Sequence, residues 1–419
     1  MNTNIRQHTQ DWSEVTVDDI KASTDNALAT GPFGSSIGSQ FFMRSGVPII
    51  RGSNLANDGH TQLIDDDFVF LSEMKATEFR RSAVFQGDLI FTCWGTVNQV
   101  GLIGKGSAYS SYIISNKQMK LTPDPTKVDS LFLFYLFSGQ ELQRQITNQS
   151  IGSSVPGFNL GHLRSLRFRI PPLAEQEVIA EALSDADALI ESLEQLLAKK
   201  RKIKQGAVRE LLRPNSSHEV QLLQDISSLK GRIGWQGLKQ AEFTTNEDQP
   251  FLITGMNFKD GAIRWNEVYH ISEVRYKVAP EIQLRPDDVL MTKDGTIGKV
   301  LYIETIPYPG KASLNSHLLL FRPIWDSYNP KYLYYQLGSQ RFKYFIELSK
   351  SGTTFFGLSQ AAVGVYPVLL PPIEEQIRIA SILSDMDAEI TALEAKLAKA
   401  RQIKQGMMQE LLTGRIRLV

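Results

Sequence analysis

Two stretches of the chain carry apolar residues at steps that alternate between four and three positions. In the second stretch they are Ile379, Leu383, Met386, Ile390, Leu393, Leu397, Ala400, Ile403, Met407 and Leu411. In the first they are Ile179, Leu183, Ala186, Ile190, Leu193, Leu197, Ile203, Ala207 and Leu211, with Lys200 interrupting the pattern where Ala400 stands in the second. This spacing is typical of the seam of a coiled coil. Each stretch follows a Pro-Pro pair, which no helix interior tolerates, so each predicts a long helix that begins just after the prolines.

The two stretches are copies of one another. Residues 171–212 recur at 371–412, an offset of 200 without a gap, and more than half of the positions are identical. The same offset holds weakly upstream, where 87–97 resembles 287–297 and 151–158 resembles 351–358. A repeated sequence predicts a repeated architecture. We expect a domain at 1–170, a spacer helix at 171–213, a second domain at 214–370 and a second spacer helix at 371–419.

Charge along the two helices predicts how they pair. From Glu175 to Glu194 there are acidic residues and no basic ones, and from Lys199 to Arg209 there are basic residues and no acidic ones; the second helix repeats this order with one exception, Arg378. Such an order suits each helix dipole, so two separate solvated helices remain an alternative. Opposite charges face each other only in an antiparallel pair, which would give the two domains a pseudo-two-fold relation. A rigid pair of helices between two similar domains would then set their spacing.

Both domains mix short strands with helices, so the predicted fold class is α/β (α+β). Segments bounded by glycine read as strands at 47–55, 87–95, 100–104, 249–257, 287–292 and 298–303. Residues 129–146 and 330–348 each read as one helix with an apolar face. Loops rich in glycine and hydroxyl groups, such as 31–40 and 351–360, suit contact with phosphate and base edges, although turns alone also explain them.

Composition narrows the function. The chain has 419 residues, with 45 basic and 45 acidic side chains, so nucleic-acid binding must rely on local basic patches. A single cysteine, Cys93, excludes a disulfide framework. The longest apolar run, 131–137, is far shorter than the roughly 18 residues that a membrane span needs. We expect a cytoplasmic protein with no membrane contact.

The sequence carries no motif for chemistry of its own. An amino-methyltransferase needs Asn or Asp before Pro-Pro and an aromatic residue after it, whereas Ile170 and Leu370 precede the prolines here. Neither Gly104-Lys105 nor Gly298-Lys299 completes a P-loop. The nearest approach to a nuclease cluster, Glu73-x-Lys75, is better explained by a solvated turn, and the six histidines lack metal-ligand spacing. We therefore predict no catalytic residues and no metal site.

Groove-reading side chains at strand ends and in glycine-flanked loops are the candidate DNA contacts. In the first domain they are Arg51, Ser53, Asn54, Thr92, Trp94, Asn98, Ser153 and Ser154. In the second domain they are Thr254, Asn257, Lys293, Asp294, Thr296, Thr353, Thr354 and Gln360. Asp294 could accept from a cytosine amino group and would repel phosphate. For each residue a role in capping or in a turn is the alternative.

The repeated motifs resemble the specificity subunit of type I restriction–modification enzymes. The resemblance covers essentially the whole chain and rests on PPLxEQ or PPIxEQ, LSDxD and KQGxxxELL, each present twice at fixed spacing. It implies two target-recognition domains that bind a bipartite, asymmetric sequence in double-stranded DNA, with helices that set the unread gap. The two domains differ in sequence, as the resemblance implies for domains that read different half-sites.

The resemblance also implies partners and their cofactors. Two methyltransferase subunits, which use S-adenosylmethionine, would dock on the helices and methylate adenine N6. Up to two restriction subunits, with ATP and Mg, would complete the nuclease. Lys199–Lys204 and Lys399–Lys404 could instead face phosphates in the gap. A protein–protein scaffold with two peptide-binding domains is the alternative function, and it predicts no salt-dependent binding to duplex DNA.

Overall fold

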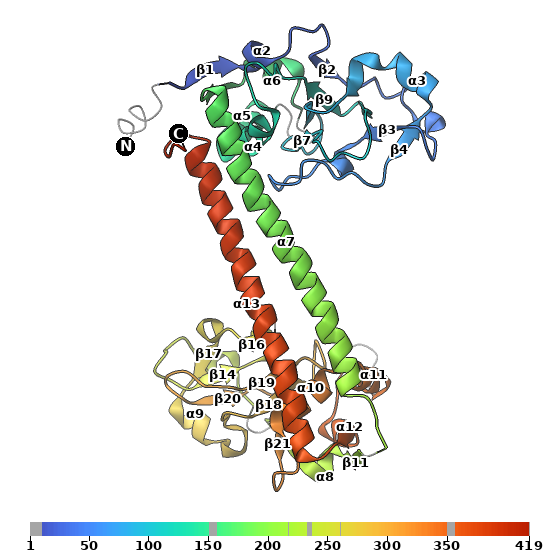
Figure 1. Cartoon of the computed structure of the whole chain (residues 1–419). Helices are drawn as coiled ribbons and strands as arrows, with labels where there is room; N and C mark the ends of the chain where they lie inside the picture. Colours follow the sequence, from blue (N-terminus) through green and yellow to red (C-terminus); the bar gives the residue numbers. More distant parts are fainter. Residues whose placement is uncertain are drawn as a thin grey trace. The chain divides into compact units, whose positions relative to one another are not determined.

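The computed structural model (Figure 1) describes residues 11–150, 157–216, 218–232, 237–259, 261–349 and 357–418. The chain divides into two compact units, which we call unit 1 (residues 1–195 and 395–419) and unit 2 (residues 196–394). Unit 1 therefore combines two segments that lie far apart in the sequence. Each unit contains a mixed α/β domain together with parts of both long helices, as the fold class predicted.

Unit 1 holds two four-stranded sheets and a separate strand pair. Its strands are β1 (Ser13–Thr16), β2 (Leu28–Thr30), β3 (Val47–Ile50), β4 (Val69–Leu71), β5 (Ala83–Val84), β6 (Leu89–Thr92), β7 (Val100–Leu102), β8 (Tyr112–Ile114), β9 (Gln118–Leu121) and β10 (Arg167–Ile170). The sheet orders are β2-β9-β6-β7 and β4-β3-β8-β5, and β1 pairs with β10. All pairs are antiparallel except β3 with β8. Every residue of β6 and β9 is buried, which makes these strands the centre of the domain.

Unit 2 repeats this plan. Its strands are β11 (Glu219–Leu222), β12 (Ser227–Lys230), β13 (Phe243–Thr244), β14 (Phe251–Ile253), β15 (Phe258–Lys259), β16 (Ala262–Ile263), β17 (Tyr269–Ile271), β18 (Val289–Thr292), β19 (Val300–Tyr302), β20 (Ala312–Leu314), β21 (Leu318–Pro323) and β22 (Pro367–Leu370). One sheet, β12-β21-β18-β19, matches the first sheet of unit 1 strand for strand, and the other is β13-β17-β14-β20. The parallel pair recurs as β14 with β20.

The short helices complete the two domains. In unit 1 they are α2 (Val17–Ile20), α3 (Glu73–Glu78), α4 (Ser130–Ser138), α5 (Gln140–Gln149) and α6 (Leu160–Ser165). In unit 2 they are α8 (Leu223–Ile226), α9 (Glu273–Lys277), α10 (Pro330–Gly338), α11 (Gln340–Ser349) and α12 (Gln360–Gly364).

The prediction of one helix at 129–146 and one at 330–348 was wrong. Each segment forms two helices, because the backbone is extended at Gly139 and at Ser339 (ψ 152° and 158°). Ser339 donates its hydroxyl hydrogen to the Gln336 carbonyl and accepts from the Phe342 N–H at 3.4 Å, so it caps the second helix. Serine and glycine are both favourable at a helix N-cap.

The long helices follow the prolines as predicted. They are α7 (Leu173–Leu211) and α13 (Ile373–Leu411), each of 39 residues. In unit 1, Lys404 pairs with Asp187 and Arg401 with Glu194. The partner of Arg401, Glu194, lies later in α7 than the partner of Lys404, Asp187. The two helices therefore run antiparallel in unit 1. In unit 2, Lys204 with Asp387, Arg201 with Glu394 and Lys200 with Glu389 give the same direction.

One part of the predicted seam was wrong. Ile203 and Ile403 are about half exposed (46% and 52%), and the neighbouring lysines turn inward instead. The side chain of Lys404 is only 7% exposed, and that of Lys204 is 26% exposed. A lysine can replace an apolar residue here because its charge meets an aspartate while its aliphatic stem packs.

Candidate nucleic-acid interface

The two units share one arrangement of backbone hydrogen bonds at the ends of their central strands, β6 and β18, and we call this arrangement the strand-end frame. In unit 1 the N–H of Cys93 donates to the Lys117 carbonyl (2.6 Å), and the N–H of Phe158 donates to the Cys93 carbonyl (2.8 Å). In unit 2 the N–H of Lys293 donates to the His317 carbonyl, and the N–H of Leu358 donates to the Lys293 carbonyl, both at 2.9 Å. These partners stand at the same offset of 200, so the frame is duplicated.

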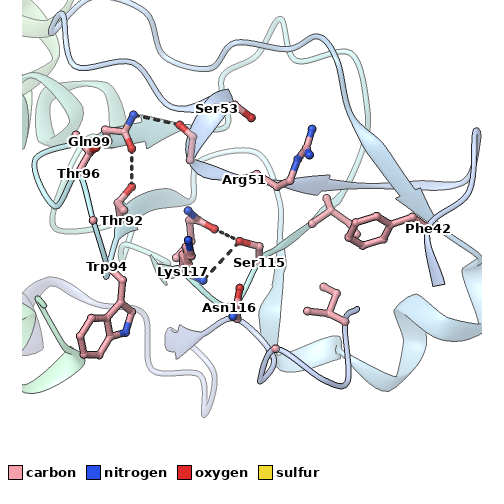
Figure 2. A pocket seen from close by; sticks show the side chains of 16 residues that line it. Phe42, Arg51, Ser53, Thr92, Trp94, Thr96, Gln99, Ser115, Asn116 and Lys117 are labelled. Atoms are coloured by element: carbon pink, nitrogen blue, oxygen red, sulfur yellow. Dashed lines mark hydrogen bonds between the residues drawn. The ribbon is translucent and has the colours of Figure 1, made fainter. Parts of the chain in front are cut away.

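In unit 1 this frame borders a cleft of about 530 Å³, shown in Figure 2, which we call the first cleft. Its lining residues are Gly34, Ile37, Phe42, Ile49, Arg51, Gly52, Ser53, Thr92, Trp94, Gly95, Thr96, Gln99, Ser115, Asn116, Lys117 and Gln118. They come from residues 34–42, from the ends of β3, β6 and β9, and from the turns that join β6 to β7 and β8 to β9. The lining includes two basic residues and no acidic one, which suits an anionic or acceptor-rich ligand.

Hydrogen bonds hold one side of the first cleft in place. The Thr92 hydroxyl donates to the Gln99 carbonyl oxygen Oε1 (3.1 Å). The Gln99 amide in turn donates to the backbone carbonyls of Gly52 (3.1 Å) and Leu55 (2.6 Å). Opposite them, Gly31 allows a close backbone approach, since a Cβ there would lie 1.7 Å from the Ser115 carbonyl oxygen. The cleft is therefore held by side-chain hydrogen bonds and by close backbone packing.

The rim and the floor of the first cleft differ in character. Trp94 is 54% exposed and Phe42 is 36% exposed, so aromatic surface lies at the rim. Gln118, at 0% exposed, belongs to the floor, where its carbonyl oxygen accepts from the Ser115 hydroxyl. Arg51 donates from Nη2 to the Asp67 carbonyl at 3.0 Å. An aromatic rim above a polar floor suits the plane and the edge of a nucleobase.

The equivalent positions in unit 2 carry different side chains. Asp294 replaces Trp94, and its carboxylate lies 3.1 Å from Nδ1 of His317, which replaces Lys117. The backbone still matches, because Trp94 forms a β-bridge with Gly157 and Asp294 forms one with Gly357. Identical frames with exchanged side chains are what two readers of different sequences require.

The structure brings four of the eight candidates of the first domain to the first cleft: Arg51, Ser53, Thr92 and Trp94. Asn98 lies apart and accepts from the Thr147 hydroxyl at 3.3 Å. Asn54 is buried, and its amide donates to the carbonyls of Ile64 (3.1 Å) and Asp66 (2.9 Å). Its side chain thus holds a loop. Ser153 and Ser154 lie outside the described residues.

In unit 2 the candidates divide in the same way. Lys293, Asp294 and Thr296 follow β18 and stay at least partly accessible. Thr254 and Asn257 are buried, and the Thr254 hydroxyl donates to the Asn257 amide oxygen at 2.9 Å. Gln360 donates to the Leu229 carbonyl at 3.0 Å, which favours a structural role. Thr353 and Thr354 lie outside the described residues.

Sequence reasoning missed a turn that differs between the units at the strand ends. Residues 115–118 of unit 1 and 315–318 of unit 2 join β8 to β9 and β20 to β21 and bring Lys117 and His317 to the strand ends. Neither segment contains a recognised motif. The offset of 200 would have pointed to them once β6 was known to pair with β9.

Arg232 is a basic residue of unit 2 whose side chain lies in the interior of the domain. It is 4% exposed and donates to the Leu314 carbonyl (2.9 Å) and the Ser313 hydroxyl (3.0 Å). Burial lowers the pKa of Arg232 to about 10. Its hydrogen bonds therefore connect elements inside unit 2.

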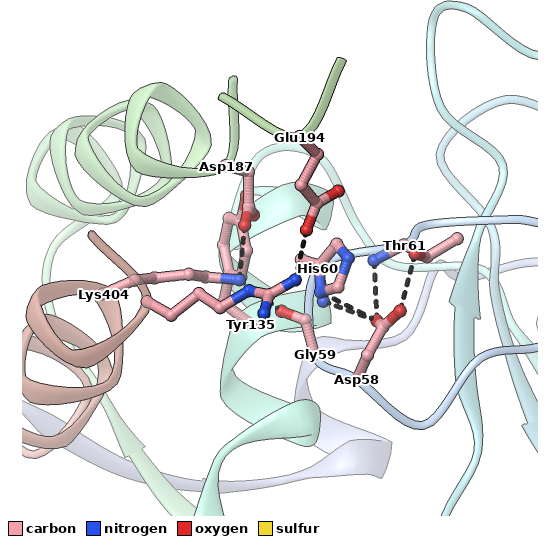
Figure 3. A network of polar contacts seen from close by, with 9 residues as sticks. Asp58, Gly59, His60, Thr61, Tyr135, Asp187, Glu194 and Lys404 are labelled. Atoms are coloured by element: carbon pink, nitrogen blue, oxygen red, sulfur yellow. Dashed lines mark hydrogen bonds and ion pairs between the residues drawn. The ribbon is translucent and has the colours of Figure 1, made fainter. Parts of the chain in front are cut away.

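A second polar arrangement joins the domain of unit 1 to its helices (Figure 3). Lys404 of α13 contacts the Asp187 carboxylate of α7 (2.6 Å) and donates to the Gly59 carbonyl (2.8 Å). Its ammonium group lies 5.3 Å from the ring centre of Tyr135, whose hydroxyl donates to Asp187 at 2.7 Å. Burial, followed by the Asp187 charge, raises the pKa of Tyr135 far above its ordinary value. We call Lys404, Asp187 and Tyr135 the unit 1 junction.

Unit 2 has the corresponding junction of Lys204, Asp387 and Tyr335. The Tyr335 hydroxyl donates to Asp387 (2.8 Å), and the Lys204 ammonium lies 5.9 Å from its ring centre. The side chain of Lys204 is more exposed than that of Lys404. The two junctions therefore share their chemistry and differ in burial.

Among the residues that the structure describes, no group of three or more His, Cys, Asp and Glu is arranged to hold a metal ion. None of the helices described has the length and apolar character that crossing a membrane requires.

Comparisons with known proteins agree with the geometry. A family model described as the type I restriction modification DNA specificity domain matches the chain twice, over residues 34–201 and 223–404. The type I restriction enzyme MjaVIII specificity subunit of Methanocaldococcus jannaschii is 26% identical over 329 residues, which make up 73% of this chain and 75% of that protein.

Two solved structures share the fold. The S subunit of a type I restriction-modification system from M. genitalium superposes with a TM-score of 0.59, at 17% identity over 96% of each chain. A chain from a structure of the type I R-M system, solved to explain its complex assembly and conformational transition, gives a TM-score of 0.54 at 15% identity, over 96% of this chain and 97% of that one.

Proposed function

Because the chain belongs to the family of type I restriction–modification DNA specificity domains, we propose that it reads a bipartite, asymmetric target in double-stranded DNA. Each unit contacts one half-site. The observation that carries this proposal is the duplicated strand-end frame, which presents Trp94 and Lys117 in unit 1 and Asp294 and His317 in unit 2. Two copies of one frame with different side chains suit two different half-sites.

The chemistry on DNA belongs to partner subunits. Two methyltransferase subunits dock on α7 and α13 and transfer a methyl group from S-adenosylmethionine to adenine N6. Up to two restriction subunits, which use ATP and Mg, join them in the cytoplasm. The long helices expose Leu189 and Ile403 in unit 1 and Leu196 and Ile203 in unit 2, each at least 39% exposed, and these apolar side chains support docking of other subunits on each helix.

The proposal is tested by co-expression of this chain with its cognate methyltransferase subunit and mapping of N6-methyladenine by single-molecule sequencing. We expect a bipartite, asymmetric motif that disappears when this chain is omitted. A continuous motif would mean that one unit alone reads DNA. An assembled complex that methylates no defined sequence would favour a scaffold with two peptide-binding domains.

A second experiment tests the spacing role of the helices. Four residues inserted after Ala198 of α7 add one helical turn, about 6 Å. We expect the unread gap of the motif to change while both half-sites persist. The control is a four-residue insertion after Lys105, in a surface turn of unit 1, which should leave the gap unchanged. Altered half-sites in the Ala198 variant would contradict a spacing role.

A further inference from the structure

The first cleft contains polar hydrogen atoms that no described residue accepts. Nε2 of Gln118 is buried and has no hydrogen-bond partner, although the Gln118 carbonyl is engaged by Ser115. Nε of Arg51 is likewise buried without a partner. Buried donors of this kind are costly unless a ligand or water accepts from them. Both residues line the cleft, so the unmet donors point to an acceptor that enters it.

The charged groups of the first cleft are also hydrogen-bond donors. Arg51 and Lys117 carry only donors, and the Lys117 side chain makes no hydrogen bond or ion pair within the described part of the chain. Asp294, a partly exposed anion that unit 2 presents at this frame, is replaced by Trp94 in unit 1. An amino group that entered the first cleft would therefore meet no carboxylate.

Among the four bases, guanine fits this polarity best. In the major groove guanine presents two acceptors, N7 and O6, whereas adenine and cytosine present an amino donor and thymine adds a methyl group. We infer that the first cleft reads a guanine in the half-site of unit 1, with Lys117 and Arg51 donating to its N7 and O6. This inference rests on the proposed function and names the base that this site selects.

A backbone phosphate is the competing acceptor, and the shape of the cleft argues against it. A phosphate could be bound at the rim by the exposed Lys117 alone, without reaching the buried Nε of Arg51. The exposed face of Trp94 offers a planar apolar surface, which a base can cover and a phosphate cannot. Unit 2 supplies an internal contrast, because Asp294 at the same frame accepts and does not donate.

The test compares methylation motifs of complexes that contain the wild-type chain, Lys117→Met or Lys105→Met. Lys105 is an exposed lysine in a turn of unit 1 that does not line the first cleft, so it is the matched control. We expect an invariant guanine in one wild-type half-site. In Lys117→Met that position should accept other bases, with discrimination reduced about tenfold or more, while the other half-site is unchanged. Lys105→Met should keep the wild-type motif.

Three outcomes would overturn the inference. The position relaxed in Lys117→Met could be an A·T pair, or Lys117→Met could lower methylation evenly at all sites, as loss of a phosphate contact does. The third is an unchanged motif in both Lys117→Met and Arg51→Met, with the complexes shown to be folded and assembled. A wild-type complex that methylates no defined sequence would instead remove the proposed function, and this inference with it.

A binding experiment tests whether Lys117 contacts N7 of the guanine. The purified complex is given a duplex target in which the selected guanine is replaced by 7-deazaguanine, which lacks the N7 acceptor. We expect the wild-type complex to bind about tenfold more weakly. We expect Lys117→Met to lose little more from the replacement, because its contact is already absent. Equal losses in both proteins would show that Lys117 does not contact N7.

Discussion

Trp94 of unit 1 and Asp294 of unit 2 occupy the same place at the end of the same strand, and they differ in size, charge and hydrogen bonding. Their backbones nevertheless make equivalent bridges, to Gly157 and to Gly357. At the junctions the opposite holds, because Lys404, Asp187 and Tyr135 have identical counterparts in Lys204, Asp387 and Tyr335. The side chains thus differ between the units at the ends of the central strands, and they are identical where the long helices meet each domain.

The junctions nevertheless differ in burial, and this gives the largest expected effect. Lys404→Met leaves the Asp187 carboxylate without its buried cation and should destabilise unit 1 by about 3 kcal/mol. Lys204→Met, at a more exposed lysine, should cost unit 2 about 1 kcal/mol. Hydrogen exchange read separately on peptides of each unit measures both losses.

The controls for this pair are Lys399→Met and Lys199→Met, since both lysines are exposed on the same helices. Each should change hydrogen exchange very little. Equal losses for Lys404→Met and Lys204→Met would show that burial does not distinguish the two junctions.

The beginnings of the long helices differ more than the junctions do. Glu175 of α7 is 1% exposed and receives two hydrogen bonds from Arg417 (2.6 and 2.7 Å), whereas Glu375 of α13 pairs with Arg378 at 3.3 Å on the surface. Arg417→Met should therefore destabilise unit 1 by about 2 kcal/mol. Arg378→Met should cost less than about 0.5 kcal/mol. Thermal unfolding measures the melting temperatures of the two variants. Similar melting temperatures would contradict the larger loss expected for Arg417→Met.

The smallest effect concerns two buried aspartates. Asp288 is held by Arg322 through two bonds of 2.6 and 2.7 Å, whereas Asp88 lies 3.9 Å from Lys120. Burial raises the pKa of Asp88 above its ordinary value of 3.8. The folded state then holds this proton more tightly than the unfolded state does, so the stabilisation is present at low pH and is lost as pH rises through the raised pKa.

Asp88→Asn should remove this loss from unit 1. Denaturant unfolding of wild type and of Asp88→Asn is repeated from about pH 4 upward. The loss appears as a difference in the slope of the unfolding free energy against pH. The same slope in wild type and in Asp88→Asn would show that Asp88 makes no contribution.

The sequence predicts the helices well and their seam less well. The Pro-Pro pairs and the spacing of apolar residues locate α7 and α13, because both signals are local. The inward turn of Lys204 and Lys404 is not local, since it depends on an aspartate from the other helix and a tyrosine from the domain. The sequence did not predict the breaks at Gly139 and Ser339, because the apolar face continues on both sides of each break.

The candidate site shows the same limit. Arg51 and Trp94 could be predicted because they follow a strand with a clear apolar pattern. Lys117 and Gln118 could not, because only the pairing of β6 with β9 brings their turn to the same edge. Asn54 and Asn257 looked similar in sequence to base-reading residues, but each folds back on its own loop. Whether an amide faces outward is decided by tertiary structure.

The identical junction residues have a consequence for inheritance. Unit 1 is completed by residues 395–419, so a crossover near the middle of the gene transfers most of a unit and leaves its closing segment behind. A recipient gene can supply that segment where its product carries the same lysine–aspartate pair that Lys404 with Asp187 and Lys204 with Asp387 form here. Recombination could therefore produce new target preferences in a single event that keeps the junction contacts.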